Sequence, residues 1–292
     1  MPERGYGWRV AVSDGNGWVE CACGQRHWGR YGAAGLLLIA GGKTTTVTSG
    51  PLPADAQILM QHRAQWSHEG GTWGLPGGAC DSHEDVVTAA IRETQEETGV
   101  QAPATLLGVH RAEHGTWSYT TVIMRTREQV APVINAESTA AAWLPIAAAS
   151  DLPLHPGLRA AWPSLTGRRV SLVVDVANVM GSRPDGWWRD RALGAQRTVD
   201  DIAPLVGRAT VDGALVGMIR AVVEGAGRST ASPHPAVLVT AARGSADDAI
   251  VASVGPDDIV VTADAELRAR VADRCAGLIG PGHLWRLVAE LG

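Results

Sequence analysis

Residues 77–100, GGACDSHEDVVTAAIRETQEETGV, predict one helix that carries more negative charge than a helix tolerates unaided. Glu93, Glu96 and Glu97 are three and four residues apart, so their carboxylates should converge on one side of the helix. Like charges placed so close raise one another's pKa values and destabilise the helix, unless a cation lies between them. The residues predicted to form the buried face have helical spacing and are Val87, Ala90, Ile91 and Thr94.

Both ends of this helix have recognisable signals. Asp81 or Ser82 can cap its start, and an acid three residues later, Glu84 or Asp85, would complete a capping box. Gly99 lies where a left-handed residue would end the helix. The glutamates of such a helix are hard oxygen ligands, and these select Mg²⁺ or Mn²⁺.

The spacing of the fixed residues in this segment resembles the Nudix box, G-x5-E-x7-R-E-U-x-E-E-x-G-U. The matching residues are Gly78, Glu84, Arg92, Glu93, Glu96, Glu97, Gly99 and Val100. Thr94 departs from the pattern, because an aliphatic residue is usual there. The resemblance extends over residues 30–160 and implies an α/β/α sandwich with a mixed sheet. It also implies hydrolysis of a nucleoside diphosphate linked to another group.

The Nudix resemblance implies roles for particular residues. The Gly77 carbonyl and the carboxylates of Glu93, Glu96 and Glu97 would hold Mg²⁺ or Mn²⁺. Glu96 or Glu97 could instead act as the general base. Arg92 would orient a glutamate, Glu84, through a charge-assisted pair, and Glu137 is the candidate for a further acid from a later loop.

Four residues outside the box are candidates for substrate binding. Arg63 could meet a phosphate. Aromatic rings that could stack a nucleotide base are Trp73, Trp117 and Tyr119. The alternative for each of the four is a packing role.

The segment before the Nudix-like region, residues 1–30, contains CACGQRHWG, in which Cys21, Cys23 and His27 could hold zinc. A structural zinc site usually has four ligands, and His62, His110 or His114 could supply the fourth. The alternative is that the two cysteines and the histidine are small packing residues.

The second half of the chain has a different pattern. Residues 171–178, 236–242 and 258–264 are apolar strands, each followed by a helical stretch, which predicts a parallel sheet covered on both faces. Acidic and amide residues follow these strands, at the edge where open α/β folds place their active sites: Asp175, Asn178, Asp247, Asp248 and Asp264. Such a group would bind Mg²⁺ or Mn²⁺ for phosphodiester hydrolysis.

The strand ends of this half are similar to those of the PIN-like nuclease domains of the NYN group, over residues 169–292. That resemblance implies a Rossmann-like sheet and a metal-dependent RNA nuclease. Residues 183–197 cluster four arginines with two tryptophans and could follow a single strand by stacking and phosphate contacts. A solvated helix with packed tryptophans is the alternative.

Length and composition agree with two globular domains. At 292 residues with 45% hydrophobic and 19% charged residues, the chain is too long for one average domain and too apolar for disorder. We expect a lead-in (1–30), a Nudix domain (31–160), a linker (161–168) and a PIN-like domain (169–292). The net charge of −5 gives no overall basic footprint for nucleic acid, and four cysteines are too few for a disulfide scaffold, so the expected location is the cytoplasm.

Two functions from different classes follow from the sequence. The first is a Mg²⁺-dependent pyrophosphohydrolase of nucleotides, with RNA as a partner of the second domain. The second is a Nudix module that senses a nucleotide and regulates or positions the PIN-like domain. No segment is long and apolar enough to predict a membrane span, and the oligomeric state is not predicted.

Overall fold

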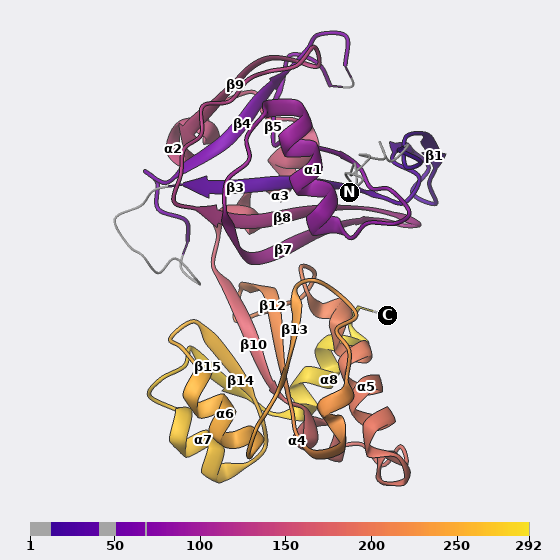
Figure 1. The fold of residues 1–292 in the computed structure, drawn as a ribbon, viewed down its shortest axis with the longest axis vertical. Coiled ribbons are helices and arrows are strands. Elements are labelled where there is room, and N and C mark those ends of the chain that lie inside the picture. Colours follow the sequence, from indigo (N-terminus) through magenta and orange to yellow (C-terminus); the bar gives the residue numbers. More distant parts are fainter. Residues whose placement is uncertain (1–12, 41–50, 68, 292) are drawn as a thin grey trace, which may run out of the picture.

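The computed structural model describes residues 13–40, 51–67 and 69–291, so the first twelve residues of the lead-in lie outside it. The chain forms two α/β halves, and β10 carries it from the first to the second (Figure 1). The elements of the first half are β1 (Trp18–Glu20), β2 (Arg26–Trp28), β3 (Ala33–Ala40), β4 (Gln57–Arg63), β5 (Trp73–Gly74), β6 (Gly77–Ala79), α1 (Val86–Thr98), β7 (Ala104–His114), β8 (Trp117–Thr126), β9 (Ser138–Pro145), α2 (Ile146–Ser150) and α3 (Pro156–Thr166).

The first half is built on a seven-stranded mixed sheet with the central order β5-β4-β3-β8-β7, to which β6 adds on β3 and β9 on β4. All eight residues of β3, AAGLLLIA, are buried, and β3 pairs in parallel with β8. Alternate residues of β3 face opposite sides: Leu36 and Leu38 join the cluster under α1, and Leu37 joins the cluster with α3. The sheet therefore lies between helices, which confirms a mixed α/β fold with a Nudix-like sheet.

Helix α3 occupies most of the segment expected to be a linker. It runs from Pro156 to Thr166, with Trp162 and Leu165 buried against the first sheet. Pro163 lies inside the helix. Its missing N–H costs one helical hydrogen bond, and the burial of the two apolar side chains offsets that loss. Only residues 167 and 168 separate α3 from β10.

The second half contains a six-stranded sheet. Its elements are β10 (Arg169–Asp175), α4 (Val176–Gly181), α5 (Arg191–Ile202), β11 (Thr210–Val211), β12 (Ala214–Val223), β13 (Val237–Ala241), α6 (Ala246–Ser253), β14 (Asp258–Val261), α7 (Ala265–Val271), β15 (Gly277–Ile279) and α8 (Pro281–Ala289), with short 3₁₀ turns at Trp187–Arg189, Ala203–Leu205 and Gly225–Ser229. The parallel strands have the order β13-β12-β10-β14-β15, and β11 is antiparallel to β12.

Both faces of this sheet are covered, as predicted. Leu172 and Val174 of β10 pack in the cluster that contains residues of α4, α5 and α8, whereas Val173 packs with α6 and α7. The three predicted strands are β10, β13 and β14. The sequence analysis missed β12, the longest strand of this sheet, because Gly217 and Arg220 interrupt its apolar run.

The two halves are in contact through β7 and β12. The backbone of Gly108 lies against Gly217, and the N–H of Arg111 donates to the carbonyl of Gly207 at 2.8 Å. One apolar cluster continues across this contact and includes Val109 and Val122 of the first half with Val170 of the second. No helix in the described ranges combines the length and the apolar character needed to cross a bilayer.

Candidate functional site

The acidic helix α1 begins later than predicted. Its N-cap is Asp85, whose carboxylate accepts from the N–H groups of Val87 at 2.8 Å and Thr88 at 3.0 Å. The prediction of Asp81 or Ser82 as the cap was therefore wrong, since the Glu84 side chain accepts from the Asp81 N–H before the helix starts. At the other end Gly99 has a φ of 64°, which confirms the left-handed C-cap.

The buried face of α1 is rotated from the predicted one. Ala90 and Thr94 are buried as expected, but Ile91 is 40% exposed. Ala89, Glu97 and Thr98 are buried instead. The rotation turns one of the three glutamates, Glu97, toward the sheet. The helix thus buries a carboxylate where the periodicity predicted only apolar side chains.

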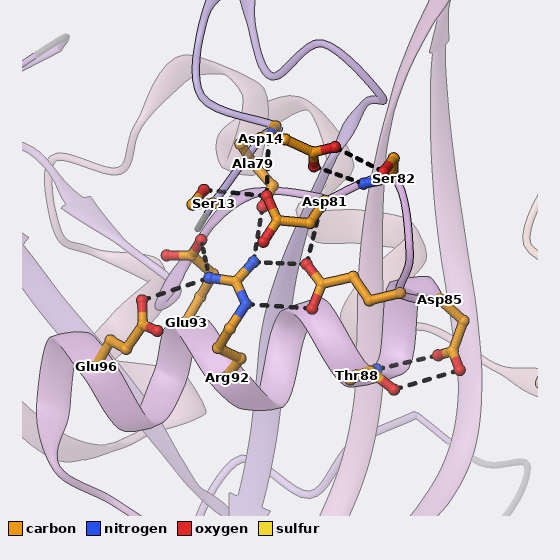
Figure 2. A network of polar contacts seen from close by, with 12 residues as sticks. Ser13, Asp14, Ala79, Asp81, Ser82, Asp85, Thr88, Arg92, Glu93 and Glu96 are labelled. Atoms are coloured by element: carbon orange, nitrogen blue, oxygen red, sulfur yellow. Dashed lines mark hydrogen bonds and ion pairs between the residues drawn. The ribbon is translucent and has the colours of Figure 1, made fainter. Parts of the chain in front are cut away.

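Arg92 organises the carboxylates around the start of α1 (Figure 2). Its Nε and Nη2 donate to the two oxygens of Glu84 at 3.1 and 2.6 Å, which is the pair that the Nudix resemblance implies. Nη1 reaches Glu93 at 2.7 Å and Glu96 at 3.3 Å. Nη2 also donates to the Ala79 carbonyl at 2.9 Å, so the guanidinium ties α1 to β6. These contacts hold Arg92 protonated, and its pKa lies above the usual value mainly because of Glu84.

Glu97 lies apart from Arg92 and is only 6% exposed. Its carboxylate accepts from Gln61 Nε2 and from the Gly77 N–H, both at 2.8 Å. Burial raises the pKa of Glu97 to about 7, and the neighbouring charges of Glu93 and Glu137 act in the same direction. The pKa of Glu93 is also raised, chiefly by burial. The two glutamates therefore lie where a negative charge is poorly compensated.

Gln61 is a site residue that the sequence analysis missed. It is buried in β4 and accepts from Ser138 Oγ at 2.7 Å, which fixes its amide toward Glu97. A signal was present in the sequence: Gln61 is two residues from Leu59, so both face α1 in a strand. A polar residue on the buried side of an apolar strand indicates a polar partner.

Gly78 is required by the position of Glu93. A Cβ atom built on Gly78 would lie 2.6 Å from the carboxyl carbon of Glu93. That distance is shorter than any real contact of this kind, so a side chain at Gly78 would displace the carboxylate. The glycine thus lets β6 and the glutamate of α1 approach each other.

The candidate aromatic residues and Glu137 occupy different surroundings. Trp73 packs against His62, with ring centroids 5.3 Å apart, and joins an apolar cluster, which agrees with packing. Tyr119 is close enough to Glu97 and Arg63 to feel both charges, and burial raises the pKa of its hydroxyl. Glu137 is exposed, and its negative charge helps to raise the pKa values of Glu93 and Glu97. Trp117 stacks on His27, and its ring centroid lies 6.4 Å from that of Tyr119.

In the second half, two acids lie where β10 and β14 end side by side. Asp175 caps α4, is 5% exposed and accepts from Asn178 N at 3.1 Å and Thr262 Oγ1 at 3.0 Å. Asp264 caps α7. Asn178 joins the two strand ends, because its Oδ1 accepts from Ala263 N at 2.7 Å. Burial raises the pKa of Asp175.

Of the remaining acids of this half, some lie near Asp175 and Asp264 and one lies apart from them. Asp247 feels the charges of Asp264 and Glu224, and Asp175 feels those of Asp247 and Glu224, so these four carboxylates lie near one another. Asp248 instead pairs with Arg270 at 2.6 Å and is exposed. Glu224 was missed because it follows β12, the strand that the sequence analysis missed; its carboxylate accepts from Ala246 N at 2.7 Å.

A cavity of about 220 Å³ opens beside Glu224. Its lining includes Val176 after β10, Glu224 after β12, and both Trp187 and Arg191 from the arginine- and tryptophan-rich segment. The Arg191 guanidinium lies 5.8 Å from the centre of the Trp187 ring. An aromatic face, a cation and an acid therefore line one hollow at the carboxyl ends of the strands.

Two clusters of possible metal ligands lie within the described ranges. Groups of three or more donor atoms that all lie within 4.8 Å of one another occur there at Cys21, Cys23 and His27 and at Asp14, Asp81 and His83. The carboxylates of Asp14 and Asp81 already accept hydrogen bonds, from Ser82 and from Gly15 N. Neither of the two acidic sites has its carboxylate oxygens this close, so a cation would draw them inward.

Known proteins resemble the first half of the chain. The model of the NUDIX domain family matches residues 45–165. The candidate 8-oxo-dGTP diphosphatase 3 of Mycobacterium tuberculosis is 46% identical over 160 residues, which are 52% of this chain and 69% of that protein. A nucleoside triphosphate pyrophosphatase/Nudix hydrolase fusion protein of Bifidobacterium longum is 39% identical over 162 residues, 53% of this chain and 31% of that protein. A crystal structure of the Nudix hydrolase RenU from M. smegmatis has a TM-score of 0.45 and 45% identity, covering 52% of this chain and 92% of that one.

Proposed function

Because this chain belongs to the NUDIX family and is a nucleotide diphosphate hydrolase, we propose that it is a Mg²⁺-dependent pyrophosphohydrolase of a nucleoside triphosphate. The single observation that carries the proposal is the arrangement of Glu93, Glu96 and Glu97 around β6 and Arg92. Attack of water on the α- or β-phosphorus would break the bridge between these two phosphates and release a nucleoside monophosphate and pyrophosphate.

The residues present fit a divalent cation. Glu84, Glu93 and Glu96 share the single guanidinium of Arg92, and Glu97 makes no ion pair with it. Negative charge therefore exceeds positive charge at this edge of the sheet, and the donors are all hard oxygens. Glu93, Glu96, Glu97 and the Gly77 carbonyl would hold Mg²⁺ or Mn²⁺. The cation would neutralise phosphate charge and lower the pKa of bound water.

The protein's own residues would supply positioning. Arg92 fixes Glu93 and Glu96 in place through its bond to the Ala79 carbonyl. If Glu96, which is exposed, does not bind the cation, it is the candidate general base. Glu137 would act from the loop before β9, and Arg63 would meet the phosphates. Tyr119 and Trp73 would then border the nucleotide's base. Trp73 also packs in the core.

We propose an oxidised purine triphosphate such as 8-oxo-dGTP as the substrate, from the name of the M. tuberculosis relative. The test is a panel of nucleotides incubated with the protein and Mg²⁺, with nucleoside monophosphate and pyrophosphate measured separately. 8-oxo-dGTP should be hydrolysed with at least about tenfold higher kcat/KM than dGTP. Equal rates on all triphosphates would overturn the substrate, and no turnover of any nucleotide would overturn the activity.

The second candidate is a nucleotide sensor, and the contact between β7 and β12 favours it over two independent domains. A nucleotide bound in the first half would then change the position of the second half through that contact. Tight binding of a nucleotide without hydrolysis, measured by calorimetry, would support the sensor. Hydrolysis that is abolished by Glu97→Gln would support the enzyme.

For the second half we propose a PIN-like, NYN-type domain over residues 169–292, with a Nudix domain over 31–160. The parallel order β13-β12-β10-β14-β15 reads 3-2-1-4-5 along the chain, and β10 and β14 flank its switch point, where ligands of such sheets bind. Asp175, Asp247, Asp264 and the newly found Glu224 would hold Mg²⁺ or Mn²⁺ there. RNA would lie across Trp187 and Arg191.

The nuclease proposal is tested on a labelled single-stranded RNA with Mn²⁺. Asp175→Asn should abolish cleavage and leave nucleotide hydrolysis unchanged, while Glu97→Gln should do the reverse. Asp248→Asn is the matched control, because Asp248 pairs with Arg270 outside the group. Cleavage that survives Asp175→Asn would overturn the assignment of this edge as the active site.

A further inference from the structure

The hairpin of β1 and β2 gathers three metal-binding side chains at its tip. The turn is closed by Cys21 N donating to Gln25 O at 3.0 Å, so Cys21, Cys23 and His27 are brought round to the same side. Cys23 Sγ lies 3.1 Å from His27 Nε2, and the three donor atoms are all within 4.8 Å of one another. Donor atoms around a tetrahedral zinc ion are separated by about 3.3–3.8 Å, given its usual bond lengths.

A candidate for the fourth donor lies in a distant part of the chain. His114 ends β7, and its ring centroid is 4.8 Å from that of His27. The Cys21 thiol contacts the His114 carbonyl, so the hairpin is seated on the turn between β7 and β8. Trp117 closes the other side: its ring stacks on His27 at 4.3 Å, and its N–H donates to Gly29 O.

We propose that Cys21, Cys23, His27 and His114 form a structural zinc site. Two thiolates and two imidazoles are a closed donor set that suits Zn²⁺ and leaves no position for substrate. A small inward movement of His114 would complete the tetrahedron. Zinc binding would release the protons of both thiols and join the hairpin to the β7–β8 turn.

The zinc site would also help to hold the segment before the acidic helix α1 in place. This part of the inference rests on the proposed function. From the hairpin the chain is bonded back to Gly15, whose carbonyl accepts from Arg30 N at 2.8 Å. Gly15 N in turn donates to Asp81 at 2.8 Å, and Asp81 N donates to Glu84, the partner of Arg92. Loss of zinc should therefore loosen the segment that holds Glu84 in place.

The test uses the full chain, purified under reducing conditions, and measures metal without any nucleotide. The protein should contain about one zinc ion per chain. Cobalt substituted for zinc should give sulfur-to-metal charge-transfer bands and intense visible bands of tetrahedral Co²⁺. Cys23→Ser, at an exposed position, should lower zinc affinity at least tenfold, and Cys275→Ser in the second half should not change it. His114→Gln should keep the sulfur bands and weaken the visible ones.

Two results would overturn the zinc site. One is a reduced protein that retains less than about a tenth of an equivalent of zinc and gives no cobalt spectrum. The other comes from protein purified separately without reductant and then denatured: a thiol count that is two short, because a Cys21–Cys23 disulfide would then occupy the donors. Failure of nucleotide hydrolysis alone leaves the metal content unaffected, so the two proposals fail separately. The activity of zinc-free protein then measures how far the hairpin supports Glu84.

Discussion

The two groups of acids in this molecule are held in place by different means. In the first half, one guanidinium, Arg92, contacts three glutamates, two of them on its own helix. In the second half, Asp175 and Asp264 are held by backbone N–H groups at the starts of two helices. Arg270, whose charge acts on Asp247, pairs with Asp248 instead. The Arg92 guanidinium positions the first group of acids, and the strand ends and helix starts of the sheet position the second.

The two ways of holding carboxylates predict different sensitivities to substitution. When one arginine fixes several carboxylates, a single substitution disturbs all of them. When each carboxylate caps its own helix, a substitution disturbs one position and leaves the others held. The first site should therefore be the more sensitive to mutation, although it is the more compact in sequence.

The largest effect is expected from Glu97→Gln. We expect nucleotide hydrolysis to fall at least about 100-fold, because a charged metal ligand is lost. Gln61 Nε2 and Gly77 N both donate to one oxygen of Glu97, Oε2, so the amide oxygen of a glutamine can keep both bonds and the substitution removes mainly the charge. Steady-state kinetics measure the fall, and circular dichroism checks the fold. Glu128→Gln, at an exposed position, is the control. Near wild-type turnover would remove Glu97 from the site.

Arg92→Lys should have the next largest effect. A lysine cannot reproduce the two-pronged contact with Glu84 and at the same time reach Glu93. We expect about a tenfold or greater loss of kcat and a destabilisation of about 1–3 kcal/mol. Kinetics and urea unfolding measure the two. In the second half Arg270→Lys is the matched change, and it should alter neither activity. Similar losses from both substitutions would contradict the contrast between the sites.

The same contrast explains how much the sequence could predict. The first group lies within one helix and the turn before it, so its spacing identifies the Nudix box directly. The fold supplied what spacing could not: the rotation that buries Glu97 and exposes Ile91, and the contact of Glu97 with Gln61. Those depend on how α1 packs on the sheet.

The second group could be predicted only in part. Asp175 and Asp264 end apolar strands, and that pattern is local. Glu224 follows β12, whose apolar run is broken by Gly217 and Arg220, so its place at the sheet edge could not be read. The orientation of the Asp248 side chain depends on its ion pair with Arg270, twenty-two residues away in the sequence. Position across a sheet is a long-range property.

The contact between the halves gives the third prediction. Gly108 has a φ of 149°, and a Cβ built on it would lie 2.8 Å from the Gly217 carbonyl oxygen. Gly108→Ala should destabilise the protein by about 1–3 kcal/mol. At Gly217 the nearest atom would be 3.5 Å away, an ordinary contact. Gly217→Ala should thus cost less than about 1 kcal/mol. Urea unfolding compares them, and equal effects would mean that β7 and β12 are not tightly packed.

The fourth prediction concerns metal binding to the second group. In a Glu97→Gln background, Mn²⁺ should still raise the melting temperature by a few degrees, through linkage to the folded state. Adding Asp175→Asn should remove most of that shift. Without metal the same change should leave stability equal or slightly higher, since it relieves repulsion from Asp247 and Glu224. Asp273→Asn, at an exposed position, is the control. If the metal-free variant instead loses several degrees, Asp175 is a structural cap.

The smallest effect is expected from His234, on the surface that the two halves share. His234 lines a cavity of about 280 Å³ together with Asp85 and Tyr31 of the first half. Its Nδ1 accepts a hydrogen bond from Ala236 N at 3.0 Å, and a protonated Nδ1 could not accept it. Burial, then the charge of Arg111, lowers the pKa of His234 below its usual value, and Asp85 opposes this in part.

A histidine whose pKa is lower in the folded state binds fewer protons there than in the unfolded chain. Its contribution to stability is therefore complete above the unfolded pKa of about 6.5 and is lost as the pH falls below it. His234→Asn keeps an acceptor for Ala236 N–H but cannot titrate. The variant should lose less stability than the wild type between pH 7.5 and pH 5.5, by about 1 kcal/mol or less. His110, whose pKa burial also lowers, is present in both proteins and cancels in the difference. His283→Asn on α8 should follow the wild-type curve. If His234→Asn follows it too, protonation of His234 does not weaken the contact between the halves.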